Sequence, residues 1–406
     1  MLDTGLDNLF LVTLVALLAP LAVGLLPALR VPAVVVEIVA GVVLGPSVLG
    51  LVEVDVPVQV LSVLGLAFLL FMVGLQLDVR QLRGELLRVA AVGYLVTLVL
   101  GSLVGVGVAA AGWVSDPLLV AVALSATSLG LVVPVLKDAG RVDTDLGRTT
   151  LAAATLADLA AVLLLTLLFS TGTTTAGARV VLLVTFAGLV ALTIGAVLFA
   201  ERWSRLSATV LRLQDTTAEI RVRAAVVLLV GFVVLAERLG LETILGALLA
   251  GAVIAAVDRD AASHPHFRTK LEAIGFGFLV PVFFVSSGLQ LDVAGLVQDP
   301  AALARTPVFL VALLLVRGLP ALLLRHRLST RETVAAGLLQ ATSLPFLVTA
   351  SMIGVEIGLL SAVTAAALVA AGIVSVLVFP TAALSLLGTA RPEPERVPET
   401  LGRRPA

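Results

Sequence analysis

The chain has 406 residues, of which 60% are hydrophobic and 13% are charged, and its formal net charge is −1. A soluble domain averages about 25% charged residues, so this composition excludes a water-soluble globular protein. The absence of cysteine excludes disulfides and thiolate metal sites.

Apolar runs that are long enough to span a bilayer recur along the chain, because a spanning helix needs about 20 apolar residues. Long unbroken runs predict helices rather than the alternating strands of a membrane barrel. We therefore predict an all-α membrane protein with about 13 transmembrane helices. The predicted spans are, in chain order, 8–29, 32–52, 58–77, 87–113, 117–137, 146–171, 179–200, 220–239, 241–257, 271–291, 307–324, 332–355 and 359–388.

The basic residues orient these predicted helices. If the N-terminus is outside, all of the 26 Lys and Arg residues lie in cytoplasmic segments except Arg179, Arg238, Arg305 and the mid-span Arg317. Basic residues near helix ends stay in the cytoplasm during membrane insertion. We therefore predict a multi-pass plasma-membrane protein with its N-terminus outside and its C-terminus in the cytoplasm.

Two short strings occur twice, with nearly the same offset. GLQLDV stands at 74–79 and 288–293, and ATSL stands at 126–129 and 341–344. An odd number of predicted spans separates the members of each pair, so the paired helices run in opposite directions. This pattern predicts an inverted-topology repeat of the kind found in many secondary transporters.

The repeats set the predicted domain organisation. Residues 1–389 form one transmembrane domain, in which repeat one covers about 32–171 and repeat two about 241–388. The charged, Pro-containing residues 390–406 are predicted to be a short disordered cytoplasmic tail.

Asp158 lies deepest among the carboxylates of the predicted spans. Ionisable residues inside a span are costly and are functional hypotheses by default. A carboxylate at this depth is tolerated when it is protonated or when it is ionised and paired with a cation. It can therefore exchange a proton for a cation, and Thr155, one helical turn before it, could add a hydroxyl ligand. The alternative is a permanent salt bridge or a polar packing residue.

Both ATSL strings lie in mid-span and are followed by residues that interrupt helices. Gly and Pro free backbone carbonyls, which lipid tolerates only where they are buried or line a cavity. We therefore predict two crossed discontinuous helices that bring oxygen ligands and helix ends to the site. The first break holds Thr127, Ser128, Gly130 and Pro134, and the second holds Thr342, Ser343 and Pro345.

The hydroxyls at the two breaks have different predicted roles. Thr127 and Ser128 are predicted to bind the ion, the alternative being hydrogen bonds between helices. Thr342 and Ser343 are predicted to shape the crossing rather than to bind the ion.

Two further ionisable residues lie within spans. Arg317 keeps its proton at any accessible pH, so we predict a fixed charge that balances the site; the alternative is a side chain that extends to the membrane interface. Glu37 is a second candidate for charge balance, unless it is a solvated acid at a helix end.

Other chemistries have little support in the sequence. His264 and His266 stand in a loop without further metal ligands, and no phosphate-binding loop occurs. No Ser-His-Asp set shares one depth in the membrane. We therefore expect no enzyme, no cofactor, no nucleic-acid partner and no metal other than a transported alkali cation.

With these features the chain resembles the monovalent cation:proton antiporter superfamily, in particular its cation:proton antiporter-2 branch. The similar stretches cover nearly the whole chain except the first helix and the tail. They are EIVAGVVLGPSVLGL (37–51), GLAFLLFMVGLQLD (65–78), SATSLGLVVPVLKD (125–138), LAAATLADLAAVLL (151–164), LGLETILGALLAGAVI (239–254) and PVFFVSSGLQLD (281–292).

The resemblance implies thirteen helices, a homodimer, and a core that moves against a dimerisation scaffold. It places the family's ion-binding aspartate on Asp158, the Thr-Ser of its first break on Thr127 and Ser128, and its basic residue on Arg317. Relatives often carry a polar residue before the aspartate, whereas this chain has Ala157. With one carboxylate at the site, we predict one-for-one, electroneutral exchange of Na⁺ or K⁺ for H⁺.

The alternative reading is a K⁺ efflux system of the glutathione-gated type. The sequence contains no nucleotide-sensing module, so such a system would rely on a separate regulatory subunit. The choice between Na⁺ and K⁺ stays open, because both ions take oxygen ligands and selectivity depends on cavity geometry.

Overall fold

The computed structural model describes residues 6–25, 33–75, 84–142, 144–169, 219–239, 243–257 and 265–387, with a few single residues between them. Most of the predicted span 179–200, residues 76–79 of the first GLQLDV string, His264 and the tail over 390–406 lie outside the described residues. The described chain is helical, with one isolated β-bridge between Val114 and Leu360 and no strand.

The first half of the chain forms seven described helices. They are α1 (Leu6–Leu25), α2 (Ala33–Leu44), α3 (Val56–Leu75), α4 (Gly84–Ala110), α5 (Pro117–Ser125), α6 (Leu129–Asp138) and α7 (Asp145–Phe169).

The second half contains shorter and less regular elements. They are α10 (Ile220–Arg238), α11 (Thr243–Val257), α12 (Pro265–Ile274), the π-helix η1 (Gly275–Leu279), α13 (Val280–Leu289), α14 (Val293–Gln298), α15 (Pro300–Leu303), α16 (Arg305–Leu313), the π-helix η2 (Leu314–Gly318), the 3₁₀-helix η3 (Leu319–Leu324), α17 (Thr330–Gln340), α18 (Pro345–Glu356) and α19 (Ala362–Leu387).

Within the described ranges, eight helical segments are long and apolar enough to cross a membrane, and three shorter apolar helices accompany them. The chain is therefore a multi-pass helical membrane protein, as predicted. The predicted total of about 13 helices stays a prediction, because the described segments do not cover the whole chain.

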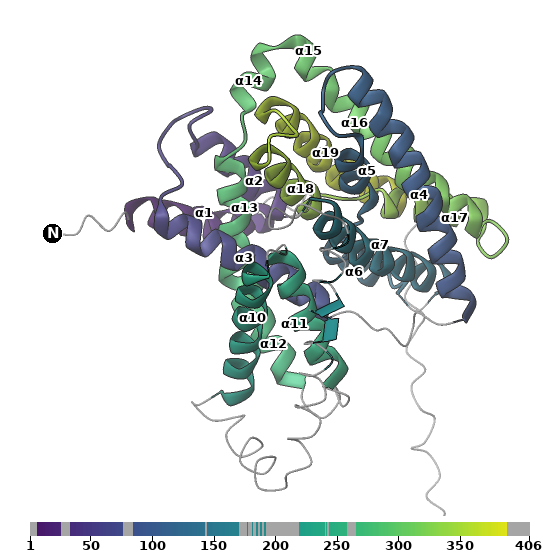
Figure 1. The fold of residues 1–406 in the computed structure, drawn as a ribbon, viewed down its shortest axis with the longest axis horizontal. Helices are drawn as coiled ribbons and strands as arrows, with labels where there is room; N and C mark the ends of the chain where they lie inside the picture. Colours follow the sequence, from purple (N-terminus) through teal and green to yellow (C-terminus); the bar gives the residue numbers. More distant parts are fainter. Residues whose placement is uncertain are drawn as a thin grey trace, which may run out of the picture.

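The helices form two groups, which Figure 1 shows on opposite sides of the molecule. In one group α2 and α3 pack against α13, and α3 also packs against α11. In the other, α4 packs against α5 and α7, and α19 packs against α16 and α17. We call the group of α1–α3 and α10–α13 the scaffold, and the group of α4–α7 and α16–α19 the core.

Glycines allow two close helix contacts inside the scaffold. Gly74 of α3 faces Gly251 of α11, and Gly41 of α2 faces Gly288 of α13. A Cβ atom at any of the four would overlap a backbone carbonyl of the opposite helix. Small residues of this kind let membrane helices approach each other closely, because packing rather than hydrophobicity drives their association in lipid.

Two spans of the core are interrupted at the ATSL strings. Residues 126–128 are non-helical between α5 and α6, and residues 342–344 are non-helical between α17 and α18. The backbone N–H of Ser128 donates to the carbonyl of Thr342 at 2.9 Å, so the two interruptions lie against each other. The interruptions therefore occur at the two places where the sequence predicts them.

Candidate functional site

Asp158 lies on α7, beside the first interrupted span. Its Oδ1 accepts from the backbone N–H of Thr127 at 3.2 Å, and its Oδ2 accepts from the N–H of Leu129 at 3.3 Å. These N–H groups are free because the first residues of α6 have no helical partners for them. The positive end of the α6 dipole also favours a negative charge here. The two N–H groups therefore fix the position of the carboxylate. The Asp158 residue is partly buried.

The Thr127 hydroxyl joins three parts of the core. It donates to the carbonyl of Gln340, the residue before the second ATSL string, at 2.6 Å. It accepts from Arg317 Nε at 2.8 Å and from Arg317 Nη2. One donated and two accepted bonds use the full capacity of a hydroxyl group. In this conformation Thr127 therefore has no hydroxyl lone pair left for an ion.

Arg317 is held inside the core by hydroxyl groups. Its side chain is 2% exposed, so it lies within the bundle and does not extend to the membrane interface. Besides its bonds to Thr127, its Nη1 donates to Thr97 Oγ1 of α4 at 3.2 Å. Among the residues that the structure describes, no salt bridge within 4.0 Å joins Arg317 to Asp158. Thr127 therefore links the two groups, because its hydroxyl accepts from Arg317 and its backbone N–H donates to Asp158.

The backbone around Arg317 is irregular. It belongs to the π-helix η2, which is followed directly by the 3₁₀-helix η3. Single π turns are rare and often occur at functional sites, because they change the direction in which side chains leave the helix. The close approach of Gly318 and Gly337 brings this irregular segment against α17.

Ser128 and Thr155 have uncommitted hydroxyl groups. Both side chains are buried, and neither hydroxyl makes a hydrogen bond within the described part of the chain. Thr155 precedes Asp158 by one turn of α7, and Ser128 lies between the two residues whose N–H groups hold the carboxylate. These two side chains are therefore candidate oxygen ligands beside Asp158.

The helix breakers sit differently in the two interruptions. Pro345 is the first residue of α18, a position where its missing N–H costs nothing. Pro134 lies inside α6, one turn after the interruption, and Gly130 faces open space.

The second interruption is anchored to α19. Ser375 Oγ accepts from the N–H of Ser343 at 3.3 Å and donates to the carbonyl of Gly372 at 2.7 Å. Thr342 Oγ1 donates back to the carbonyl of Leu338 at 3.1 Å. These contacts hold the shape of the interruption and occupy the backbone N–H of Ser343.

The remaining predicted residues lie apart from this network. Glu37 is 4% exposed on α2, so it is not a solvated acid, and it makes no hydrogen bond or ion pair among the described residues. His266 is in α12, and the described residues contain no group of His, Cys, Asp and Glu that could hold a metal ion.

Sequence reasoning missed two members of the network, Thr97 and Gln340. Both are polar and buried, at 0% and 3% exposure. Neither is ionisable, so the rule that singled out Asp158 does not select them, whereas a search for any polar residue inside an apolar run would. Their partners could not have been assigned, because Arg317 lies 220 residues from Thr97 and Thr127 lies 213 residues from Gln340.

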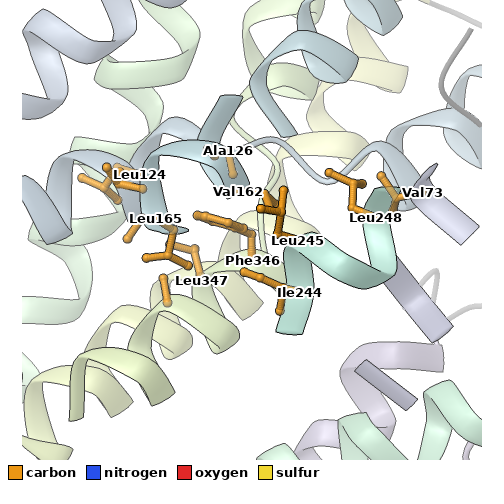
Figure 2. Close-up of a cluster of buried hydrophobic side chains, with 14 of the residues drawn as sticks. Val73, Leu124, Ala126, Val162, Leu165, Ile244, Leu245, Leu248, Phe346 and Leu347 are labelled. Atoms are coloured by element: carbon orange, nitrogen blue, oxygen red, sulfur yellow. The ribbon is translucent and has the colours of Figure 1, made fainter. Parts of the chain in front are cut away.

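An apolar cluster, which we call the seal, lies on one side of the site. On α7 it follows Asp158 by one and two turns, and Figure 2 shows its core side chains against those of α11. All of its members are at most 9% exposed. They are Val162, Leu165, Ile244, Leu245, Leu248, Phe346 and Leu347. Between Asp158 and the end of the bundle at which α7 ends, core and scaffold are therefore in dry contact.

Comparisons with known proteins all point to one family of membrane proteins. Residues 13–387 match the family model described as sodium/hydrogen exchanger, transmembrane. The putative Na⁺/H⁺ antiporter YjbQ of Bacillus subtilis is 31% identical over 92% of this chain, which spans 62% of that longer protein. The Na⁺/H⁺-K⁺ antiporter GerN of Bacillus cereus is 31% identical over 71% of this chain and 72% of its own length.

A solved structure shares the fold. The sodium proton antiporter MjNhaP1 of Methanocaldococcus jannaschii superimposes with a TM-score of 0.63, covering 94% of this chain and 99% of that one. The sequence identity is 16%, so the similarity concerns the arrangement of helices.

Replacement of Thr127 tests whether its hydroxyl holds the network together. In Thr127→Val, Arg317 Nε and Nη2 and the Gln340 carbonyl lose their partner, and each buried unpaired group costs about 1–3 kcal/mol. We expect a clear fall in the thermal unfolding midpoint of the detergent-purified protein. Thr127→Ser keeps the hydroxyl and should retain most of the wild-type stability. Equal midpoints for the Val and Ser variants would contradict the assignment.

Proposed function

The chain belongs to the sodium/hydrogen exchanger transmembrane family, and on that premise we propose that it exchanges a monovalent cation, Na⁺ or K⁺, for H⁺. The observation that carries the proposal is the half-buried Asp158 carboxylate on the free N–H groups of an interrupted helix. A protein with this arrangement needs neither ATP nor a cofactor, because the ion gradients supply the energy.

One carboxylate serves both ions in turn. In the empty site the N–H groups of Thr127 and Leu129 stabilise the ionised carboxylate. A proton or an alkali cation can then neutralise it, but the two compete for the same oxygens. Competition of this kind couples the two flows, since the carboxylate binds one ion only after it has released the other.

The cation also needs ligands other than Asp158. We assign this role to Ser128 and Thr155, whose hydroxyls are uncommitted, because alkali ions prefer hard oxygen ligands. For Thr127 the proposal differs from the sequence-based prediction: its hydroxyl orients Arg317 rather than binding the ion. Arg317 then acts as the fixed positive charge that balances the carboxylate when no cation is bound.

An inverted repeat accounts for the scaffold contacts. The GLQLDV strings pair α3 with α13, and Ala-Gly-Val-Val at 40–43 with Ala-Gly-Ala-Val at 250–253 pairs α2 with α11. A pseudo-two-fold axis that exchanges these pairs turns the Gly41–Gly288 contact into the Gly251–Gly74 contact. Both contacts are present. Together with the adjoining interruptions they support the predicted repeat and its crossed discontinuous helices.

The seal bears on how the site opens to one side of the membrane at a time. It closes the site toward the end of α7, while Asp158 keeps a partial exposure that the seal does not remove. With the predicted N-out orientation, the seal faces outward and the structure is open to the cytoplasm. The core would then move along the α3–α11 surface of a dimeric scaffold to expose Asp158 outside.

The alternative function is a K⁺ efflux system that depends on a separate regulatory subunit. Both functions use the same carboxylate, and they differ in whether transport runs without an effector. Exchange by the purified chain alone, in liposomes without glutathione, favours the antiporter.

The first test removes the carrier. Asp158→Asn should abolish cation-dependent proton flux in proteoliposomes assayed with Li⁺, Na⁺, K⁺ and Rb⁺, because a neutral amide cannot exchange a proton for a cation. Asp299→Asn is a matched control, since Asp299 caps a short helix far along the chain and Asn caps equally well. Full exchange by Asp158→Asn would remove the proposed role.

A second test concerns charge. Ala157 leaves one carboxylate at the site, so each cycle should move one cation against one proton. Exchange in proteoliposomes should then be independent of an imposed membrane potential, and the flux should reverse where the two ion gradients are equal. A strong dependence of steady-state exchange on voltage would show that a second proton is carried.

A third test uses the natural absence of cysteine. Joining Val162→Cys to Leu245→Cys with a cleavable bifunctional thiol reagent should fix α7 against α11 and stop exchange. Reductant should restore it. The two single-cysteine variants, treated in the same way, are the controls. Undiminished exchange after complete cross-linking would show that the seal does not move during transport.

A further inference from the structure

A crevice enters the core on the side of Arg317 away from the seal. It runs between α4, α7, η3 and α17, from Leu86 and Arg327 at its mouth to Arg317 and Gln340 at its floor. An ion pair between Arg327 and Glu85 lies at the mouth. All of these elements belong to the core, so the crevice is separate from the surface between core and scaffold. Its enclosed part has room for a water-sized occupant.

The charge at the floor has no direct ionic partner among the described residues, and Asp158 offsets it only from beyond 4.0 Å. Arg317 is 2% exposed, and its partners are the neutral hydroxyls of Thr127 and Thr97. No carboxylate lies within 4.0 Å of it among the described residues. A buried charge normally has an ionic partner, because desolvation is otherwise too costly.

Donors are left over at the same place. A guanidinium group has five N–H bonds, and three are used by the two threonines. Two N–H groups of Arg317 therefore remain. Gln340 is 3% exposed, and its side-chain amide makes no hydrogen bond within the described part of the chain. The floor thus offers N–H donors from two buried side chains.

The crevice walls favour one class of occupant. The lining residues include two arginines and no acidic side chain. Arg327 is paired with Glu85 at the mouth, so the positive charge inside the crevice comes from Arg317. Leu86, Val89 and Leu324 make the walls apolar, which disfavours large or strongly hydrated ions. A small, weakly hydrated anion meets both conditions.

We propose that the crevice binds a small monovalent anion of the size of chloride, held by the free N–H groups of Arg317 and the amide of Gln340. The anion supplies a direct counter-charge to Arg317, which Asp158 offsets only from beyond 4.0 Å. Binding of this anion does not depend on the proposed exchange activity. If a cation occupies Asp158, the carboxylate no longer offsets Arg317, so cation and anion should bind with positive coupling.

The test measures thermal unfolding of the purified full-length chain in sodium chloride, bromide, gluconate and sulfate at equal ionic strength. Chloride and bromide should raise the unfolding midpoint above that in gluconate by about 2 °C or more, since a ligand stabilises the state that binds it. Sulfate stabilises proteins by exclusion from their surface, so its effect should be the same in every variant.

The decisive variant carries its own carboxylate at the floor of the crevice. Gln340→Glu places a carboxylate at the floor, so its midpoint in gluconate should equal that of the wild type in chloride, with no further gain from chloride. Gln298→Glu makes the same change at an exposed position and should keep the chloride effect. Ala153→Val fills the crevice wall and should lose the effect even if Gln340→Glu does not fold.

Two results would overturn the proposal. The first is equal wild-type midpoints in chloride and gluconate, which would mean that the crevice holds water only. The second is an unchanged chloride effect in Gln340→Glu or in Ala153→Val, which would place the anion elsewhere.

Discussion

The arrangement of the core depends on the hydrogen bonds that one residue, Thr127, makes with its hydroxyl and its backbone N–H. Its hydroxyl joins the buried Arg317 to the carbonyl that precedes the second interruption, while its backbone N–H holds Asp158. Four separate segments of the core therefore meet at one residue. The cost of unpaired polar groups in an apolar interior makes these bonds mutually dependent, because losing the hydroxyl would leave several groups unsatisfied together.

The scaffold is held by a different kind of contact. Gly41, Gly74, Gly251 and Gly288 let backbones meet without side chains between them, and no polar network is needed there. Close backbone packing makes the scaffold a firm surface. The core meets this surface through apolar side chains such as Val162 and Leu245. Apolar contacts are non-directional, so they impose little preference for one position of the core along the scaffold over another.

Much of this could be predicted from the sequence because polar residues are rare in apolar spans. Asp158 and the two ATSL strings are conspicuous for that reason, and both interruptions occur where the strings stand. Pro345 begins a helix as expected, whereas Pro134 lies inside one, because a proline is tolerated where neighbouring segments satisfy the freed carbonyl. The saturation of Thr127 could not be predicted, since its partners Arg317 and Gln340 lie 190 and 213 residues away. The π turn at Arg317 likewise has no local signal, because it depends on packing against α17.

The contact between Gly372 and the second interruption shows how the two interruptions differ. In the register of the ATSL strings, Asp158 corresponds to Ile373, and at that place α19 lies so close to the Ser343 carbonyl that a Cβ on Gly372 would be 3.0 Å from it. The first interruption thus has a carboxylate beside it, whereas the corresponding space beside the second is filled by backbone. The two interruptions are therefore not equivalent, because α19 packs too closely against the second to admit a side chain at position 372 without a shift of its neighbours.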